Sequence, residues 1–376
     1  MTMEMPPRGV SGGGAAEAVG RETAALGSRA LRVSGARWSG TETLRAAAAS
    51  LRAHGVDAIA VSQDSGEPTL ERLEETVRIA EAERVTVVVG LGGGSVLDVA
   101  KATAGLCFPG RKPVSEYFYG LRADSDSALP WIALPTTAGT GSEATPNAVL
   151  SDGDRQKQSI RGDRRWLAAT VLLDPGLTVS CSPQVTAWSG MDALTQAIES
   201  HTSAGAHVLT EPCSAEAVRL IAGSIRRAHR EPEDVQARTD MAYGSLLAGI
   251  ALANARLGVV HGLAHPLGLR YHIPHGLVCG VLLPWAIAYN TPACADKYGD
   301  LARLGGAGHA AQDLLDWVRA ANRELGIPYS LRAFGLRRED FAWIVEQSMP
   351  SGSLRANPRP VRPEDLFDLL DAQLSR

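Results

Sequence analysis

The first half of the chain alternates short apolar runs with amphipathic ones. Runs rich in β-branched residues predict strands, and the stretches between them have the apolar spacing of helices. The predicted strands are 29–35, 57–62, 85–90, 128–137 and 169–175, and the predicted helices include 43–55, 69–84 and 95–105. Because 85–90 (VTVVVG) is continuously apolar, we expect it to be buried on both faces of a parallel sheet. This alternation is typical of an open, doubly wound α/β sheet.

From about residue 180 the pattern changes to helical segments that follow one another, with hardly any strand pattern between them. The first of them are 183–202, 211–229 and 234–258. We therefore predict an α/β dinucleotide-binding domain over 1–180 and an all-α domain over 181–376. The length of 376 residues agrees with two domains, because a single core stops growing near about 250–300 residues.

Composition then excludes several classes of protein. The chain is 45% hydrophobic and 21% charged, as in soluble globular proteins. Its net charge of -4, without a long basic run, gives no reason to expect nucleic acid or a membrane surface as a partner. No apolar segment approaches the roughly 20 residues that span a bilayer, and the first residues do not resemble a signal peptide. Five scattered cysteines without a CxxC pair predict reduced thiols in a cytoplasmic protein.

A glycine turn, Gly92, Gly93 and Gly94, lies between a predicted buried strand and a predicted helix. Glycines let backbone N–H groups approach a phosphate, and the N-terminus of a helix favours negative charge. We expect Ser95 to cap that helix and to donate to a phosphate oxygen. The spacing is not GxGxxG, so a plain tight turn is the alternative. The strand before the turn and the helix after it favour phosphate binding.

A second polar turn follows the strand predicted at 128–137. It supplies the hydroxyls of Thr136, Thr137 and Thr140. Ligands of open α/β sheets bind at the carboxyl ends of the strands, so the two turns together predict a binding cleft.

Four of the nine histidines lie within 259–276. His261 and His265 are four residues apart and share a helix face, until Pro266 is expected to disturb the helix. His275 follows a proline and is predicted in a turn. Imidazoles and a carboxylate are usual ligands of divalent transition metals, and Asp192 could supply the carboxylate.

Four stretches together resemble the iron-containing (group III) alcohol dehydrogenases. They are GLGGGSVLDVAK, LPTTAGTGSEAT, GMDALTQAIES and GVVHGLAHPLGLRYHIPHG, in the order and spacing of that family. The likeness spans nearly the whole chain. It implies a dehydroquinate synthase-like fold, with an α/β nucleotide domain, a helical domain and an active site in the cleft between them. It also implies interconversion of alcohols and carbonyls with NAD(H) or NADP(H).

Carried over residue by residue, the resemblance assigns three sets of positions. The cofactor-binding residues would be Gly92, Gly93, Gly94, Ser95, Asp98, Thr136, Thr137, Thr140 and Lys157. The metal ligands would be Asp192, Gln196, His261 and His275. His265 matches a histidine near the nicotinamide that relays a proton. His272 is an alternative ligand or proton donor, and a surface histidine is the other interpretation.

Two departures from the family pattern matter. Gln196 stands where the family has a histidine, and a neutral amide is a weak ligand for Fe or Zn, so metal binding is expected to be weakened or lost. The first strand ends in Gly35, with Arg37 close by, where NAD-preferring members have an aspartate. A glycine with a nearby arginine accommodates a 2′-phosphate, which predicts that NADP(H) is preferred over NAD(H).

These residues predict an NAD(P)H-dependent reductase of a small aldehyde or ketone, which the family implies to be a homodimer. The alternatives are a lyase or cyclase of the dehydroquinate synthase-like type, a reductase with weakened metal dependence such as the maleylacetate or phosphonoacetaldehyde types, and an inactive relic. Arg270 could bind an anionic substrate, with a solvated surface arginine as the other interpretation.

Overall fold

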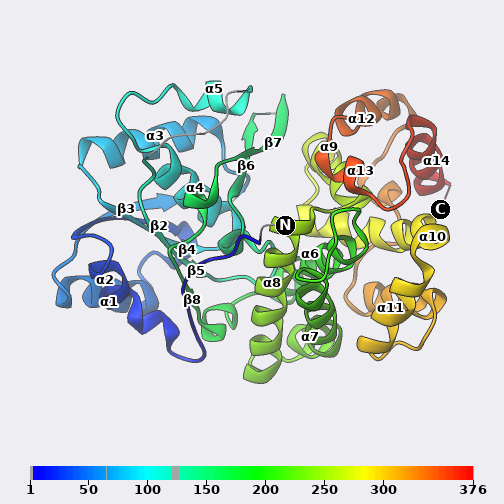
Figure 1. Ribbon diagram of the computed structural model, residues 1–376, viewed down its shortest axis with the longest axis horizontal. Helices are drawn as coiled ribbons and strands as arrows, with labels where there is room; N and C mark the ends of the chain where they lie inside the picture. Colours follow the sequence, from blue (N-terminus) through cyan, green and yellow to red (C-terminus); the bar gives the residue numbers. More distant parts are fainter. Residues whose placement is uncertain (1–2, 65, 121–126, 154, 376) are drawn as a thin grey trace. The chain divides into compact units, whose positions relative to one another are not determined.

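The first half of the chain forms one parallel sheet of six strands in the order β3-β2-β4-β5-β8-β1 (Figure 1). The computed structural model describes residues 3–64, 66–120, 127–153 and 155–375. The strands of this sheet are β1 (Gly9–Ser11), β2 (Arg29–Gly35), β3 (Asp57–Gln63), β4 (Val87–Gly92), β5 (Trp131–Pro135) and β8 (Thr170–Leu173). The predicted α/β class of this half is confirmed.

Helices cover both faces of the sheet, α1 and α2 on one and α3 and α4 on the other (Figure 1). The helices of this half are α1 (Val19–Ala24), α2 (Glu42–Ala53), α3 (Leu70–Ala82), α4 (Gly94–Leu106) and α5 (Val114–Phe118). Side chains alternate along a strand, so Val87, Val89 and Leu91 of β4 join the core under α1 and α2. The opposite face of β4 packs against α4, where a Cβ added to Gly90 would lie 2.8 Å from Ala100. Helices on both faces explain why β4 is buried throughout.

The direction of winding reverses between β2 and β4. β2 pairs with β3 on one side and with β4 on the other. The crevice beyond the carboxyl ends of strands at such a reversal is where open α/β sheets bind ligands. The residues at those ends are Gly35 of β2 and the glycine turn after β4.

Several local features differ from the sequence prediction, among them the unpredicted strand β1 and the end of β4, which lies two residues later than expected. Ser95 does not cap α4: Gly93 is the N-cap residue, and no side chain accepts a capping hydrogen bond there. An antiparallel hairpin, β6 (Asn147–Asp152) and β7 (Gln156–Arg161), was not predicted, because QKQSIR has too few apolar residues to indicate a strand. β5 begins at Trp131, three residues later than expected.

The second half is helical, as predicted, apart from short 3-10 turns. Its helices are α6 (Pro183–Thr202), α7 (Glu211–Arg230), α8 (Val235–Ala255), α9 (Val259–Tyr271), α10 (His275–Leu304), α11 (Ala311–Glu324), α12 (Phe341–Ser348), α13 (Gly352–Ala356) and α14 (Pro363–Leu374). By their contacts, the compact units are Glu4–Thr137 with Ser142–Val179, and the chain from Ser180 onward with Ala138–Gly141.

Helix α10 is long and apolar enough to cross a membrane by length and composition. However, 67% of its most apolar window is buried inside the protein, where it packs against α6, α9 and α11. Its buried side chains belong to the hydrophobic core of the helical unit.

Candidate metal and cofactor sites

Three helices of the helical unit bring one carboxylate and two imidazoles together. Asp192 lies on α6, His261 on α9, and His275 is the first residue of α10. Asp192 Oδ1 is 3.3 Å from His261 Nε2 and 3.7 Å from His275 Nε2. Asp192 and His261 are buried, and the His275 side chain is 24% exposed. These donor atoms converge as the ligands of a metal ion do.

Two details of these helices correct the sequence prediction. α9 continues through Pro266 to Tyr271, because Leu263 and Leu267 on either side are anchored in the core and outweigh one missing hydrogen bond. His275 is not in a turn but begins α10, after His272 in a left-handed conformation with φ 52.

Two glycines allow the close approach that builds the cluster. A Cβ on Gly276 would lie 2.1 Å from the carbonyl oxygen of Trp188, so only glycine lets α10 start against α6 beside Asp192. A Cβ on Gly258 would lie 2.9 Å from Oε1 of Glu199, so glycine also lets α9 start against that carboxylate.

Glu199, which the sequence analysis did not single out, holds His261 in place. Its Oε2 accepts a hydrogen bond of 2.6 Å from His261 Nδ1, and its Oε1 accepts one of 2.7 Å from the Val260 amide. With Nδ1 bonded to Glu199, the other ring nitrogen, Nε2, faces Asp192 and is the one that a metal ion would use. A carboxylate behind the ring is the arrangement that orients metal-bound histidines. Only the fold shows this role, because Glu199 and His261 are 62 residues apart.

The electrostatics of the cluster suit a cation. Burial alone would raise the pKa of Asp192, but the His275 and His261 imidazoles outweigh burial and lower it. Burial favours the neutral form of His261. The Cys279 sulfur and the Asp192 and Glu199 carboxylates outweigh burial and raise the pKa of that ring. The buried carboxylates therefore attract positive charge to this point, which protonated imidazole or a metal ion can supply.

The sequence-predicted ligand Gln196 is buried, one helical turn after Asp192 on α6. Its Oε1 has no hydrogen-bond partner among the described residues. Such an orphaned buried acceptor is costly unless a cation or water meets it. A fifth side chain, the buried thiol of Cys279, also joins the cluster of Asp192, His261 and His275. Sequence reasoning missed it, because a lone cysteine in an apolar helix looks like core packing.

The other histidines named in the sequence analysis do not contribute a donor atom to this cluster of the described residues. The ring of His265 is half-buried, and its centroid is 5.6 Å from that of His275. His272 is exposed at the end of α9. His201 is buried and bonded to the Ser214 hydroxyl at 2.9 Å. Arg270 pairs with Asp340 at 2.6 Å, which leaves the anion-binding interpretation of that arginine without support.

The predicted cofactor residues of the α/β unit meet at the carboxyl edge of the sheet. Thr136 N donates to the carbonyl of Gly92, and a Cβ on Gly93 would lie 3.3 Å from the Thr137 side chain. Arg37, just after β2, donates to the Thr136 hydroxyl at 3.3 Å. The loops after β2, β4 and β5 therefore adjoin one another. The first turn of α4 has no side-chain cap, which suits an anion.

Three further predicted cofactor residues take different positions. Asp98 is buried and accepts hydrogen bonds from the Ser142 hydroxyl at 2.6 Å and the Val149 amide at 2.9 Å, so it ties the second loop to α4. Lys157 on β7 pairs with Glu67 at 2.6 Å. Thr140 is exposed and belongs to the segment Ala138–Gly141 of the helical unit.

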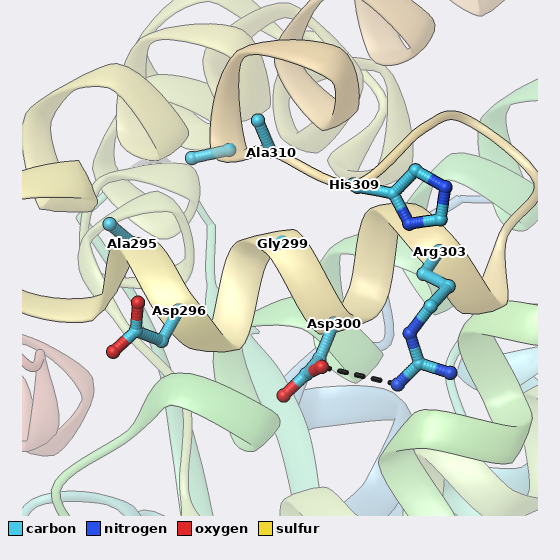
Figure 2. A pocket seen from close by; sticks show the side chains of 8 residues that line it. Ala295, Asp296, Gly299, Asp300, Arg303, His309 and Ala310 are labelled. Carbon is cyan, nitrogen blue, oxygen red and sulfur yellow. Dashed lines mark hydrogen bonds and ion pairs between the residues drawn. The ribbon is translucent and has the colours of Figure 1, made fainter.

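A hollow lies elsewhere, between the later part of α10 and the segment before α11 (Figure 2). Its described lining residues include none of the predicted site residues, and its Asp300 and Arg303 side chains pair at 3.1 Å. Nothing about this hollow points to the chemistry of the metal or cofactor.

Two family profiles match nearly the whole chain. The profile of iron-containing alcohol dehydrogenases matches residues 6–175, and the profile of the C-terminal part of the Fe-containing alcohol dehydrogenase family matches residues 186–374.

Individual proteins agree with these profiles. Lactaldehyde reductase of Escherichia coli (strain K12) is 32% identical over 309 residues, which are 80% of each chain. NAD-dependent methanol dehydrogenase of Bacillus methanolicus is 30% identical over 97% of this chain and 98% of its own length. The crystal structure of a 1,3-propanediol oxidoreductase matches with a TM-score of 0.94 and 31% identity, over 99% of both chains. These similarities favour a dehydrogenase over the lyase or cyclase alternative.

Proposed function

This chain belongs to the iron-containing alcohol dehydrogenase family and is an oxidoreductase of alcohols and aldehydes, and we propose that it reduces a small aldehyde or ketone with metal assistance. The observation that carries the metal proposal is the convergence of Asp192, His261 and His275, with donor atoms 3.3 and 3.7 Å apart. In this proposal the domain 1–180 binds the nicotinamide cofactor, and the domain 181–376 binds the metal.

The residues fit a divalent cation, with Fe or Zn as candidates. Asp192, His261 and His275 would hold it, and Gln196 Oε1 is the buried acceptor that a cation would satisfy. When bound, the metal supplies Lewis-acid polarisation of the substrate oxygen. Glu199 keeps His261 in the tautomer that presents Nε2 to the cluster.

The bound nicotinamide would supply a hydride for the carbonyl carbon, and the protein would have to supply a proton for the carbonyl oxygen. We assign the proton to a ring nitrogen of His265, which is half-buried next to His275. His272, the second candidate, is exposed and would exchange protons with solvent more readily.

The cofactor is held, in this proposal, by Gly92, Gly93, Gly94, Ser95, Asp98, Thr136, Thr137, Thr140 and Lys157. Gly35 and Arg37 are proposed to set a preference for NADP(H), since no carboxylate at Gly35 repels a 2′-phosphate and Arg37 lies at the same edge as Thr136. The methanol dehydrogenase relative is NAD-dependent by name, so the proposed preference rests on Gly35 and Arg37 of this chain alone.

Steady-state kinetics with both cofactors test that preference. We expect a higher kcat/KM with NADPH than with NADH, and Gly35→Asp should move the ratio toward NADH by about tenfold or more, as a like-charge repulsion of about 1.4 kcal/mol or more would give. A native enzyme that prefers NADH tenfold would overturn the proposal.

Elemental analysis of protein purified without chelator, paired with NADPH oxidation against a panel of aldehydes, tests the metal proposal. We expect near-stoichiometric metal and loss of turnover when it is removed. Asp192→Asn should lower both, and Glu216→Gln, on an exposed ion pair of α7, should leave both unchanged. Full activity in metal-free protein would refute the metal role. We also propose a cytoplasmic homodimer, to be checked by light scattering and cell fractionation.

A further inference from the structure

Cys279 lies one helical turn after His275 on α10, on the side of the helix that faces the cluster. Its Sγ is 3.7 Å from His275 Nε2 and 3.9 Å from His261 Nε2. One donor atom from each of Asp192, His261, His275 and Cys279 lies within 4.8 Å of the others. The thiol is fully buried, so it reaches this point through the packing of α10 rather than through a mobile loop.

The spacing of these atoms matches that of a tetrahedral metal site. With bonds of about 2.0–2.1 Å to nitrogen or oxygen and about 2.3 Å to sulfur, a tetrahedral ion holds N and O donors about 3.4 Å apart and S and N donors about 3.6 Å apart. The observed N–O distances are 3.3 and 3.7 Å, and the observed S–N distances are 3.7 and 3.9 Å. The other two donor pairs, Asp192 with Cys279 and His261 with His275, lie within 4.8 Å, and binding would draw the side chains together around the ion.

A thiol ligand would strengthen a metal site in which one of the neighbouring donors is an amide. Gln196 offers an amide oxygen, a weak donor to transition metals, at the place where the family places an imidazole. A thiolate is a stronger and softer donor than an amide, and it favours Zn(II) and Co(II) over hard cations. Binding forms a metal–sulfur bond and releases the thiol proton to solvent.

We propose that Cys279 is a protein ligand of the metal and that it compensates for the imidazole missing at Gln196. The site is then Asp192, His261, His275 and Cys279, with the Gln196 amide as a weaker neighbour. This inference rests on the metal proposed above. It adds that the site binds Zn(II) more tightly than Fe(II), a preference that a soft thiolate ligand strengthens.

Replacement of the metal with Co(II) tests the assignment without reference to activity. Thiolate ligation to Co(II) produces an intense charge-transfer band in the near ultraviolet, which oxygen and nitrogen ligands do not produce. We expect the full-length wild-type protein, loaded with one Co(II), to show this band. Cys279→Ser and Cys279→Ala should lose it, and their Zn(II) affinity should fall by about tenfold or more.

Cys294→Ser is the matched control. Cys294 is a buried thiol at the kink within α10, and its Sγ donates to the carbonyl oxygen of Asn290 at 3.2 Å. This variant should keep both the band and the affinity. Thermal unfolding of the metal-free variants shows whether a lost band reflects a lost ligand or a lost fold. The Co(II) spectrum of the wild-type protein tests the assignment even if a variant does not fold.

The outcomes are distinct. Bound Co(II) without the band in wild type, or a band that persists in Cys279→Ser, overturns the role of Cys279 while leaving the metal itself intact. No binding of either Co(II) or Zn(II) overturns this inference together with the proposed metal function. A measured preference for Fe(II) over Zn(II) in wild type overturns the claim about selectivity.

Discussion

Replacement of Glu199 by glutamine is the most informative perturbation of the site, because it removes a charge while preserving shape. Glu199 is 4% exposed, and it accepts hydrogen bonds from the Val260 amide, from the His261 amide and from His261 Nδ1. Glutamine keeps one acceptor oxygen but places an amide donor opposite one of these N–H groups. A hydrogen bond to a charged group contributes about 1.5–3 kcal/mol, so we expect a destabilisation of about 2–3 kcal/mol.

The same change should weaken metal binding, because His261 would no longer be held with Nε2 toward Asp192. Loss of the partner behind a ligating histidine typically lowers metal affinity about 10–100-fold. Zn(II) affinity by competition with a chelating dye, together with urea unfolding, measures both effects. Glu216→Gln, an exposed carboxylate paired with Arg219 on α7, is the control. Unchanged affinity and unchanged stability in Glu199→Gln would refute this account of the site.

Three further predictions concern stability. Burial raises the pKa of Glu143 to about 7 from its ordinary 4.5, so the folded state keeps a proton that the unfolded state releases. Stability should fall by up to about 3 kcal/mol as the pH rises from about 4.5 to 7, and urea unfolding of Glu143→Gln should show a smaller fall. Gly105→Ala should lower the free energy of unfolding by about 1–3 kcal/mol, because its Cβ would lie 2.1 Å from a ring atom of Trp166. Gly223→Ala, on α7 with nothing within 4 Å of the added Cβ, should instead raise Tm slightly. Chelation should lower Tm, and Zn(II) at about 100 times its Kd should restore about 2.7 kcal/mol; an unchanged Tm would contradict binding to the folded state.

Local patterns predicted most of the secondary structure. The predicted strand 29–35 and the predicted helix 183–202 coincide with β2 and α6. Single-residue rules were less reliable. Pro266 did not break α9, since the hydrophobic core on both sides of it held the helix. Ser95 did not cap α4, since the strand before it extends to Gly92 and Gly93 takes the cap position.

The sequence by itself predicted the alternation of strands and helices in the first half, the change to helices near residue 180 and four candidate metal ligands, because motif residues and periodicity are local properties. Only the tertiary structure decided what surrounds those candidates. Glu199 meets His261 across 62 residues, and Cys279 turns toward the cluster because Gly276 lets α10 start against α6. Such contacts depend on how helices pack, and no local pattern of apolar and polar residues encodes them.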